Sequence, residues 1–230
     1  MSEQLLEAIE IETGRNPAAS VIWMHGLGAD GNDFVPVVQE LGLPQALPVR
    51  FIFPHAPMQP VTINNGYVMR AWYDVSLDDL EGRSRRADEN GVRASQAAIG
   101  RLIAREAEKG ISFKNIVLAG FSQGGAVALQ TGLRYPQQLA GVLALSTYLP
   151  LADSLPQEAS PANQRTPIFM AHGTHDPVVP YAMGSKSKEL LGTMGYSVEW
   201  HDYPMQHSVC LEEIQDIGVW LKRVLATQLS

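Results

Sequence analysis

The stretch LAGFSQGGAVAL places a serine between glycines at the point where an apolar run becomes a helical pattern. Gly120, Ser122 and Gly124 make a G-x-S-x-G motif. Between a strand and a helix, this motif forms a sharp turn that exposes the serine hydroxyl above the sheet. Glycine also lets a strand and the following helix pack closely, so packing alone is an alternative explanation. The first interpretation predicts that Ser122 is a nucleophile.

A serine nucleophile needs a histidine base and a carboxylate that orients the base. In the α/β-hydrolase arrangement the chain order is serine, acid, histidine. Besides glutamates, the acids that follow the serine are Asp153, Asp176, Asp202 and Asp216. Asp176 is best placed, because it begins a loop after an apolar run and precedes a proline that stiffens the turn. The alternative for this residue is a simple Asp-Pro turn.

The same chain order narrows the choice of base. Both histidines of the HGTHD stretch precede or adjoin Asp176, which leaves His201 and His207. His201 alternates within SVEWHDY and fits a residue on a strand face. His207 follows YPMQ in a loop before the last helical pattern, where a side chain could swing toward the serine. We therefore predict His207 as the base, with a surface or helix-capping histidine as the alternative.

A glycine-rich turn, HGLG at residues 25–28, follows the apolar run VIWM. By itself it fits a tight strand-to-helix connection. Next to a serine nucleophile it has a second use, because an oxyanion hole takes one amide from the residue after the nucleophile and one from a loop after an early strand. This predicts the backbone amides of Gln123 and Leu27 as the donors.

Short apolar runs and helical patterns alternate along the chain. Strands are predicted over 21–24, 49–53, 115–121, 140–146, 167–173 and 197–203, and helices over 33–41, 92–107, 122–134, 183–194 and 211–226. Such alternation indicates an α/β fold with a mostly parallel central sheet and helices on both faces. No linker divides residues 1–230, which favours a single domain. The patternless stretch 56–83 could fold over the sheet edge and form part of a binding site.

Composition excludes several classes of function. The net charge of −7 disfavours nucleic acid as a partner. Histidines and the lone cysteine form no metal-binding cluster, and no phosphate-binding loop is present, so neither a metal nor another cofactor is expected. The acidic start and the absence of a long apolar run argue against export and stable membrane insertion. Cys210 suits a reducing compartment, so we expect a cytoplasmic protein; a homodimer stays open.

Taken together, the motifs resemble one family closely. VIWMHGLGADGNDF, FPHAP, MRAWYD, LAGFSQGGAVAL, GVLALSTYLP, HGTHDPVVP and YPMQHSV occur in the order found in the carboxylesterase and acyl-protein thioesterase group of α/β-hydrolases. The resemblance spans about residues 18–225. It implies a compact α/β-hydrolase without a large cap domain, which hydrolyses carboxylic esters and, in some members, thioesters of acylated proteins or lysophospholipids.

The resemblance also assigns residues. It implies Ser122 as the nucleophile, Asp176 as the acid and His207 as the base, with Leu27 and Gln123 as oxyanion donors. The residues that fall where the family lines its acyl pocket are Trp72, Tyr148, Leu149 and Val179. One departure is Gln206, where many members carry glycine, which could alter the loop that bears the base.

These observations predict a serine carboxylesterase that hydrolyses short- to medium-chain esters through an acyl-enzyme on a Ser-His-Asp triad. The partner is then a small ester or acyl-thioester substrate. An acyl-protein thioesterase, a lysophospholipase or a peptidase on the same triad is the first alternative. A binding protein on a hydrolase scaffold that has lost turnover is the second.

Overall fold

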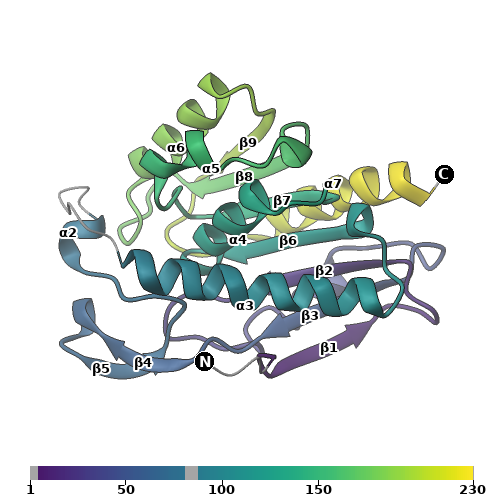
Figure 1. The fold of residues 1–230 in the computed structure, drawn as a ribbon, viewed down its shortest axis with the longest axis horizontal. Helices are drawn as coiled ribbons and strands as arrows, with labels where there is room; N and C mark the ends of the chain where they lie inside the picture. Colours follow the sequence, from purple (N-terminus) through teal and green to yellow (C-terminus); the bar gives the residue numbers. More distant parts are fainter. Residues whose placement is uncertain (1–4, 81–87, 230) are drawn as a thin grey trace.

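The computed structural model describes residues 5–80 and 88–229. Seven of its described strands form one sheet in the order β1-β3-β2-β6-β7-β8-β9 (Figure 1). Within it, β1 is antiparallel to β3 and the other neighbouring strands are parallel, as predicted. The strands are β1 (Ala8–Glu12), β2 (Ala19–Met24), β3 (Val49–Pro54), β6 (Ile116–Phe121), β7 (Gly141–Leu145), β8 (Ile168–Gly173) and β9 (Val198–Tyr203).

Helices cover both faces of this sheet. One face packs against α3 (Glu89–Glu108), α4 (Gln123–Arg134) and α6 (Tyr181–Thr193), and the other against α1 (Val37–Glu40) and α7 (Leu211–Leu229). Short helices α2 (Leu77–Leu80) and α5 (Leu155–Glu158) lie in connections. Among the helices of the described chain, none combines the length and the apolar character needed to cross a membrane.

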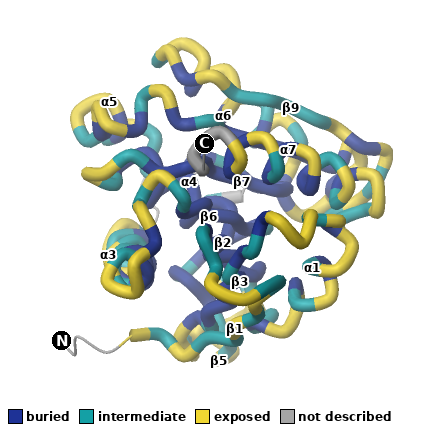
Figure 2. Tube along the Cα trace, turned by 90° about the vertical axis from the view of Figure 1, so that its right-hand side faces the viewer, coloured by how far each residue is buried: buried dark blue, intermediate teal, exposed yellow. Residues whose placement is uncertain are grey.

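The alternation of side chains along β2 shows how the two cores form. Ile22 and Met24 pack on the side of α3 and α4, whereas Val21 and Trp23 pack on the side of α1 and α7. Successive strand residues point to opposite faces, so a strand covered on both sides must be apolar throughout. Figure 2 shows the consequence, with the central strands buried between partly exposed helices.

Most predicted elements are confirmed, and the structure differs from the prediction in three places. The helix predicted over 33–41 is confined to α1, because Pro36 disfavours helical geometry in the residue before it. The edge strand β1 was not predicted. Nor was the hairpin of β4 (Met58–Val61) and β5 (Tyr67–Arg70), which occupies part of the stretch 56–83. Residues 81–83 of that stretch lie outside the described residues.

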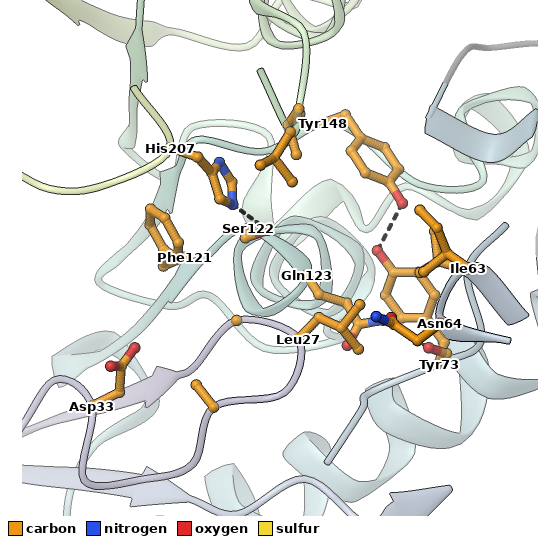
Figure 3. A pocket seen from close by; sticks show the side chains of 15 residues that line it. Leu27, Asp33, Ile63, Asn64, Tyr73, Phe121, Ser122, Gln123, Tyr148 and His207 are labelled. Carbon is orange, nitrogen blue, oxygen red and sulfur yellow. Dashed lines mark hydrogen bonds between the residues drawn. The ribbon is translucent and has the colours of Figure 1, made fainter. Parts of the chain in front are cut away.

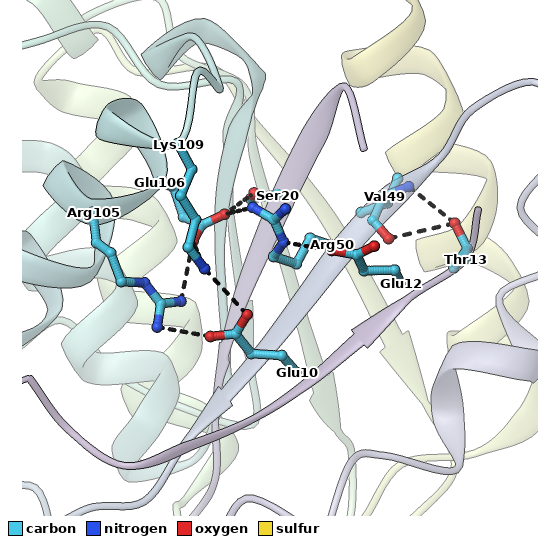
Figure 4. A network of polar contacts seen from close by, with 9 residues as sticks. All are labelled: Glu10, Glu12, Thr13, Ser20, Val49, Arg50, Arg105, Glu106 and Lys109. Carbon is cyan, nitrogen blue, oxygen red and sulfur yellow. Dashed lines mark hydrogen bonds and ion pairs between the residues drawn. The ribbon is translucent and has the colours of Figure 1, made fainter. Parts of the chain in front are cut away.

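A buried ion network fastens α3 to the amino ends of β2 and β3 (Figure 4). The carboxylate of Glu106 is fully buried and accepts hydrogen bonds from Ser20 (2.7 Å), Arg50 (2.7 Å) and Arg105 (3.0 Å). Burial acts to raise the pKa of Glu106, but the hydrogen bonds from Ser20 and Arg50 outweigh it and the net shift is downward. The charge is therefore retained inside the fold.

The sheet has a switch point between β2 and β6. From β2 the chain moves outward to β3, and from β6 it moves the other way to β7, β8 and β9. Loops on the two sides of a switch point diverge and leave a crevice at the carboxyl ends of the strands. The loops that carry HGLG and Ser122 begin at this crevice.

Candidate active site

Ser122 occupies the turn between β6 and α4 with φ 54° and ψ −121°. A positive φ is unfavourable for serine and persists only where its surroundings hold it. Here the Ser122 N–H donates to Leu145 O (2.8 Å), while its carbonyl oxygen accepts from Ala126 N (3.1 Å) and the Thr147 hydroxyl (2.6 Å). Backbone and side-chain bonds on both sides thus fix the strained turn.

The flanking glycines are required by close approach. A Cβ atom on Gly120 would lie 2.3 Å from the Gly124 carbonyl carbon, and one on Gly124 would lie 2.3 Å from Met24 O. No side chain fits at such distances. The motif therefore has both of the roles considered from the sequence, since tight packing is what lets the turn form.

A chain of hydrogen bonds connects Ser122, His207 and Asp176. His207 Nε2 lies 2.9 Å from Ser122 Oγ, and His207 Nδ1 lies 2.7 Å from Asp176 Oδ2. Because the carboxylate only accepts, Nδ1 carries the hydrogen and Nε2 is free to accept the serine proton. Ser122 as a whole is only 8% exposed. This geometry suits general-base activation of a serine.

The side chain of Asp176 is fully buried and held in place. Its Oδ1 accepts from the amides of Val178 (2.8 Å) and Val179 (2.9 Å). Burial acts to raise the pKa of Asp176, but hydrogen bonds from His207 and from the two amides outweigh it, so the pKa is lowered. The carboxylate stays charged beside the imidazole, which stabilises an imidazolium when one forms.

The other sequence candidates lie elsewhere. His201 stacks on Phe169 with ring centroids 4.8 Å apart, and Asp216 accepts a hydrogen bond from the Tyr203 hydroxyl (2.8 Å). His207 instead rests against Phe121, with centroids 4.7 Å apart. Of the weighed residues, the structure brings Asp176 and His207 to Ser122.

The two amides expected to bind an oxyanion lie on the same cavity as Ser122. Gln123 is the first residue of α4, where the N–H has no partner within its own helix. In the loop after β2, Gly28 N–H donates to Arg70 O (2.9 Å) and Ala29 N–H to Gly26 O (3.3 Å). Leu27 N–H takes no such bond within the described residues, so it is available for a ligand.

The buried side chain of His25 holds this loop in place through two hydrogen bonds. Its Nε2 accepts from Ala56 N–H (3.1 Å), so Nδ1 carries the hydrogen that is donated to Gly26 O (2.7 Å). Burial lowers the pKa of His25, in spite of the Gly26 bond and the charge of Asp30. The ring therefore stays neutral, which both hydrogen bonds require.

The Gln123 side chain has a structural task of its own, which the sequence did not reveal. Its Oε1 accepts from Trp72 N–H (2.8 Å) and its Nε2 donates to Tyr73 O (2.7 Å). Both bonds are buried. The residue whose amide is predicted to bind the oxyanion thus also clamps the backbone segment that follows β5.

A cavity of about 350 Å³ opens beside Ser122 (Figure 3). Tyr148 and Val179 line it, as the resemblance implied, but Trp72 and Leu149 do not. Trp72 is buried under the HGLG loop, where its indole N–H donates to His25 O (2.9 Å). Leu149 lies in a separate cavity toward α6.

Other lining residues were not anticipated. They are mainly apolar and come from the loop after β2, the segment around the hairpin, the end of β6 and the loop after β8: Ala29, Asp33, Ile63, Asn64, Tyr73, Val75, Phe121 and Val178. The stretch 56–83, which the sequence suggested as part of a binding site, contributes Ile63, Asn64, Tyr73 and Val75.

A mostly parallel sheet with helices on both faces, carrying Ser122, His207 and Asp176 in one hydrogen-bonded chain at its carboxyl edge, defines a serine hydrolase of the α/β-hydrolase fold. The chain belongs to the phospholipase/carboxylesterase family, whose signature matches residues 6–225. This confirms the resemblance seen in the motifs.

Individual relatives and solved structures support this family assignment. Acyl-protein thioesterase 1 of Neurospora crassa is 45% identical over 211 residues, which are 88% of this chain and 85% of that protein. The crystal structure of Arabidopsis thaliana SOBER1 has a TM-score of 0.83 at 31% identity and covers 90% of this chain and 99% of SOBER1. The structure of Zea mays acyl-protein thioesterase 2 has a TM-score of 0.81 at 29% identity and covers 95% and 99% of the two chains.

Proposed function

We propose that this protein is an acyl-thioester hydrolase that removes acyl groups from acylated proteins and also cleaves simple carboxylic esters. The observation that carries the proposal is the mainly apolar cavity that adjoins both Ser122 and the Leu27 and Gln123 amides. An acyl chain in this cavity would bring its carbonyl to the nucleophile. Similarity to proteins named acyl-protein thioesterase supports our choice of the thioester over the ester as the preferred substrate, the reverse of the order expected from the sequence.

In the proposed reaction, Ser122 Oγ attacks the acyl carbonyl while His207 Nε2 takes the hydroxyl proton. The amides of Leu27 and Gln123 hold the oxyanion of the tetrahedral intermediate. Collapse of the intermediate breaks the C–S bond, and His207 returns the proton to the departing thiolate. Water then attacks the acyl-enzyme with His207 again as base, which releases the acid and restores Ser122. Asp176 keeps the imidazole in the required tautomer throughout.

The test compares kcat/KM for one peptide acylated on cysteine and for the same peptide acylated on serine. The proposal expects the thioester peptide to be the better substrate and Ser122→Ala to abolish both activities. Turnover of the ester with none of the thioester would make the protein a carboxylesterase. Preference for a lysophospholipid would make it a lysophospholipase.

Labelling with a fluorophosphonate separates an enzyme from an inert scaffold. An active site of the proposed kind reacts at Ser122, and Ser122→Ala loses the label. A wild-type protein that takes no label would point to a binding protein.

We further propose a cytoplasmic location, in which Cys210, the chain's single cysteine, stays reduced.

A further inference from the structure

Within the mainly apolar acyl cavity, two tyrosine hydroxyls meet on the wall away from His207. Tyr73 and Tyr148 both line it, and their hydroxyl oxygens lie 2.9 Å apart. Figure 3 shows this pair on the side of the cavity away from His207, next to Ile63. The wall around the pair is otherwise made of the apolar Ile63 and Val75 and of Asn64. A polar group is thus built into the region that an acyl chain would enter.

The two hydroxyls carry two hydrogens but share only one hydrogen bond. Each hydroxyl has one hydrogen to donate and can accept as well, so one bond between them leaves one hydrogen free. Neither hydroxyl has a further hydrogen bond within the described residues. Burial raises the pKa of Tyr148 to about 12 and raises that of Tyr73, so both hydroxyls keep their hydrogens at neutral pH.

The pair is also held in place from both sides. Tyr73 O accepts from the Gln123 side chain (2.7 Å), and the residue after Tyr148, Leu149, donates its N–H to Ser187 Oγ (2.9 Å). Groups fixed in this way lose little conformational entropy when a ligand binds, so this loss does not cancel the free energy gained from a hydrogen bond to the ligand.

A saturated chain packed on the pair would leave the spare hydrogen without an acceptor, which is unfavourable in a buried place. Asp79 contributes negative charge at both tyrosines, which disfavours a carboxylate there. Resting on the proposed function, we propose that Tyr73 and Tyr148 form a specificity element for acyl groups with a neutral oxygen function, such as an ether, hydroxyl or ketone. The spare hydroxyl hydrogen donates to that oxygen.

The experiment is an oxygen scan along the acyl chain. Octanoyl thioesters of N-acetylcysteamine are compared with analogues in which one methylene at a time is replaced by an ether oxygen. Each kcat/KM is divided by the rate of alkaline hydrolysis of the same compound, which removes the electronic effect of the oxygen. Wild-type protein is expected to prefer the oxygen at one position by about 3- to 10-fold, the value of one neutral hydrogen bond.

Variants assign that preference to the pair. The double variant Tyr73→Phe/Tyr148→Phe should abolish it, because no hydroxyl hydrogen is then left to donate, whereas either single variant keeps one donor. Tyr67→Phe, on the exposed start of β5, is the matched control and should keep the preference. Fluorophosphonate labelling and circular dichroism identify folded variants.

A preference absent from the wild type at every position, or one that survives in the double variant, would overturn the inference. In that case the octanoyl thioester would still be hydrolysed, and the proposed function would stand. No turnover of the octanoyl thioester itself would overturn both.

Discussion

Glu213 is a carboxyl group whose ionisation the fold opposes. It lies in the first turn of α7 with 0% of its surface exposed, and the backbone of Cys210 is the one group in the described residues that favours its charged form. Burial, to which the charge of Asp216 adds, raises its pKa from 4.5 to about 8. We therefore predict that Glu213→Gln, which is neutral at every pH, stabilises the protein at neutral pH.

The size of this effect follows from linkage. Between pH 4.5 and about 8, folded protein holds a proton on Glu213 that the unfolded chain has released, so the stability of the wild type falls as pH rises across this window. Each pH unit is worth about 1.4 kcal/mol. At pH 7 the proton uptake therefore costs the wild type up to about 3 kcal/mol, and Glu213→Gln should gain that amount.

Urea unfolding, followed by tryptophan fluorescence from pH 5 to pH 8.5, measures the difference. The free energies of unfolding of variant and wild type should lie close together at the acidic end and separate as pH rises. Glu212→Gln is the matched control, because Glu212 is its exposed neighbour in the same turn and should leave the pH profile unchanged. Profiles of Glu213→Gln and wild type that run parallel would refute the reasoning.

Three further predictions concern the site and the fold. Ser122→Ala and His207→Ala should each lower kcat by at least ~10³ in steady-state assays with the fold intact, because the hydrogen-bonded residues act as a unit; a variant that kept a tenth of the activity would contradict its assignment. Trp72→Ala should reduce kcat/KM for acetyl and octanoyl esters alike, because its indole supports the HGLG loop and does not line the cavity; a loss confined to octanoyl esters would be inconsistent with this placement. Glu106→Gln should lower the free energy of unfolding by about 3 kcal/mol at pH 7, since it removes the buried carboxylate to which Ser20, Arg50 and Arg105 donate. Because the pKa of Glu106 is lowered in the fold, this deficit should shrink as urea titrations are carried below the unfolded value of about 4.5; a deficit independent of pH would argue against a charged Glu106.

Sequence patterns predicted the inner strands because each is an uninterrupted apolar run. β2 and β8 are buried at every residue, as strands covered on both faces must be. The edge strand β1 reads AIEIE, and its short alternation gives a much weaker signal. The hairpin of β4 and β5 exposes Met58, Tyr67 and Val68, so burial imposes little pattern on it. Strands without a covered face cannot be found from hydrophobicity alone.

The triad was predictable because chain order and loop position leave few choices, whereas the cavity wall was not. Trp72 and Tyr73 are adjacent, yet Trp72 packs under the HGLG loop and Tyr73 lines the cavity. Motifs identify the segment but not the side to which each residue points. That direction depends on the Gln123 clamp, a contact between residues 50 or more positions apart. Tyr148 and Leu149 are likewise adjacent in the sequence, yet only Tyr148 lines the cavity beside Ser122.

The Gln123 clamp binds only backbone atoms, namely Trp72 N–H and Tyr73 O. Backbone atoms are present whatever the side chains are, so the cavity-lining side chains of the segment from Ile63 to Val75 can change while the segment keeps its attachment to α4, provided that Trp72 stays to hold the HGLG loop. That segment supplies much of the cavity wall but no residue of the triad. Acyl selectivity can therefore be exchanged as a cassette, in laboratory grafts or by natural drift, while the machinery that breaks the bond stays as it is.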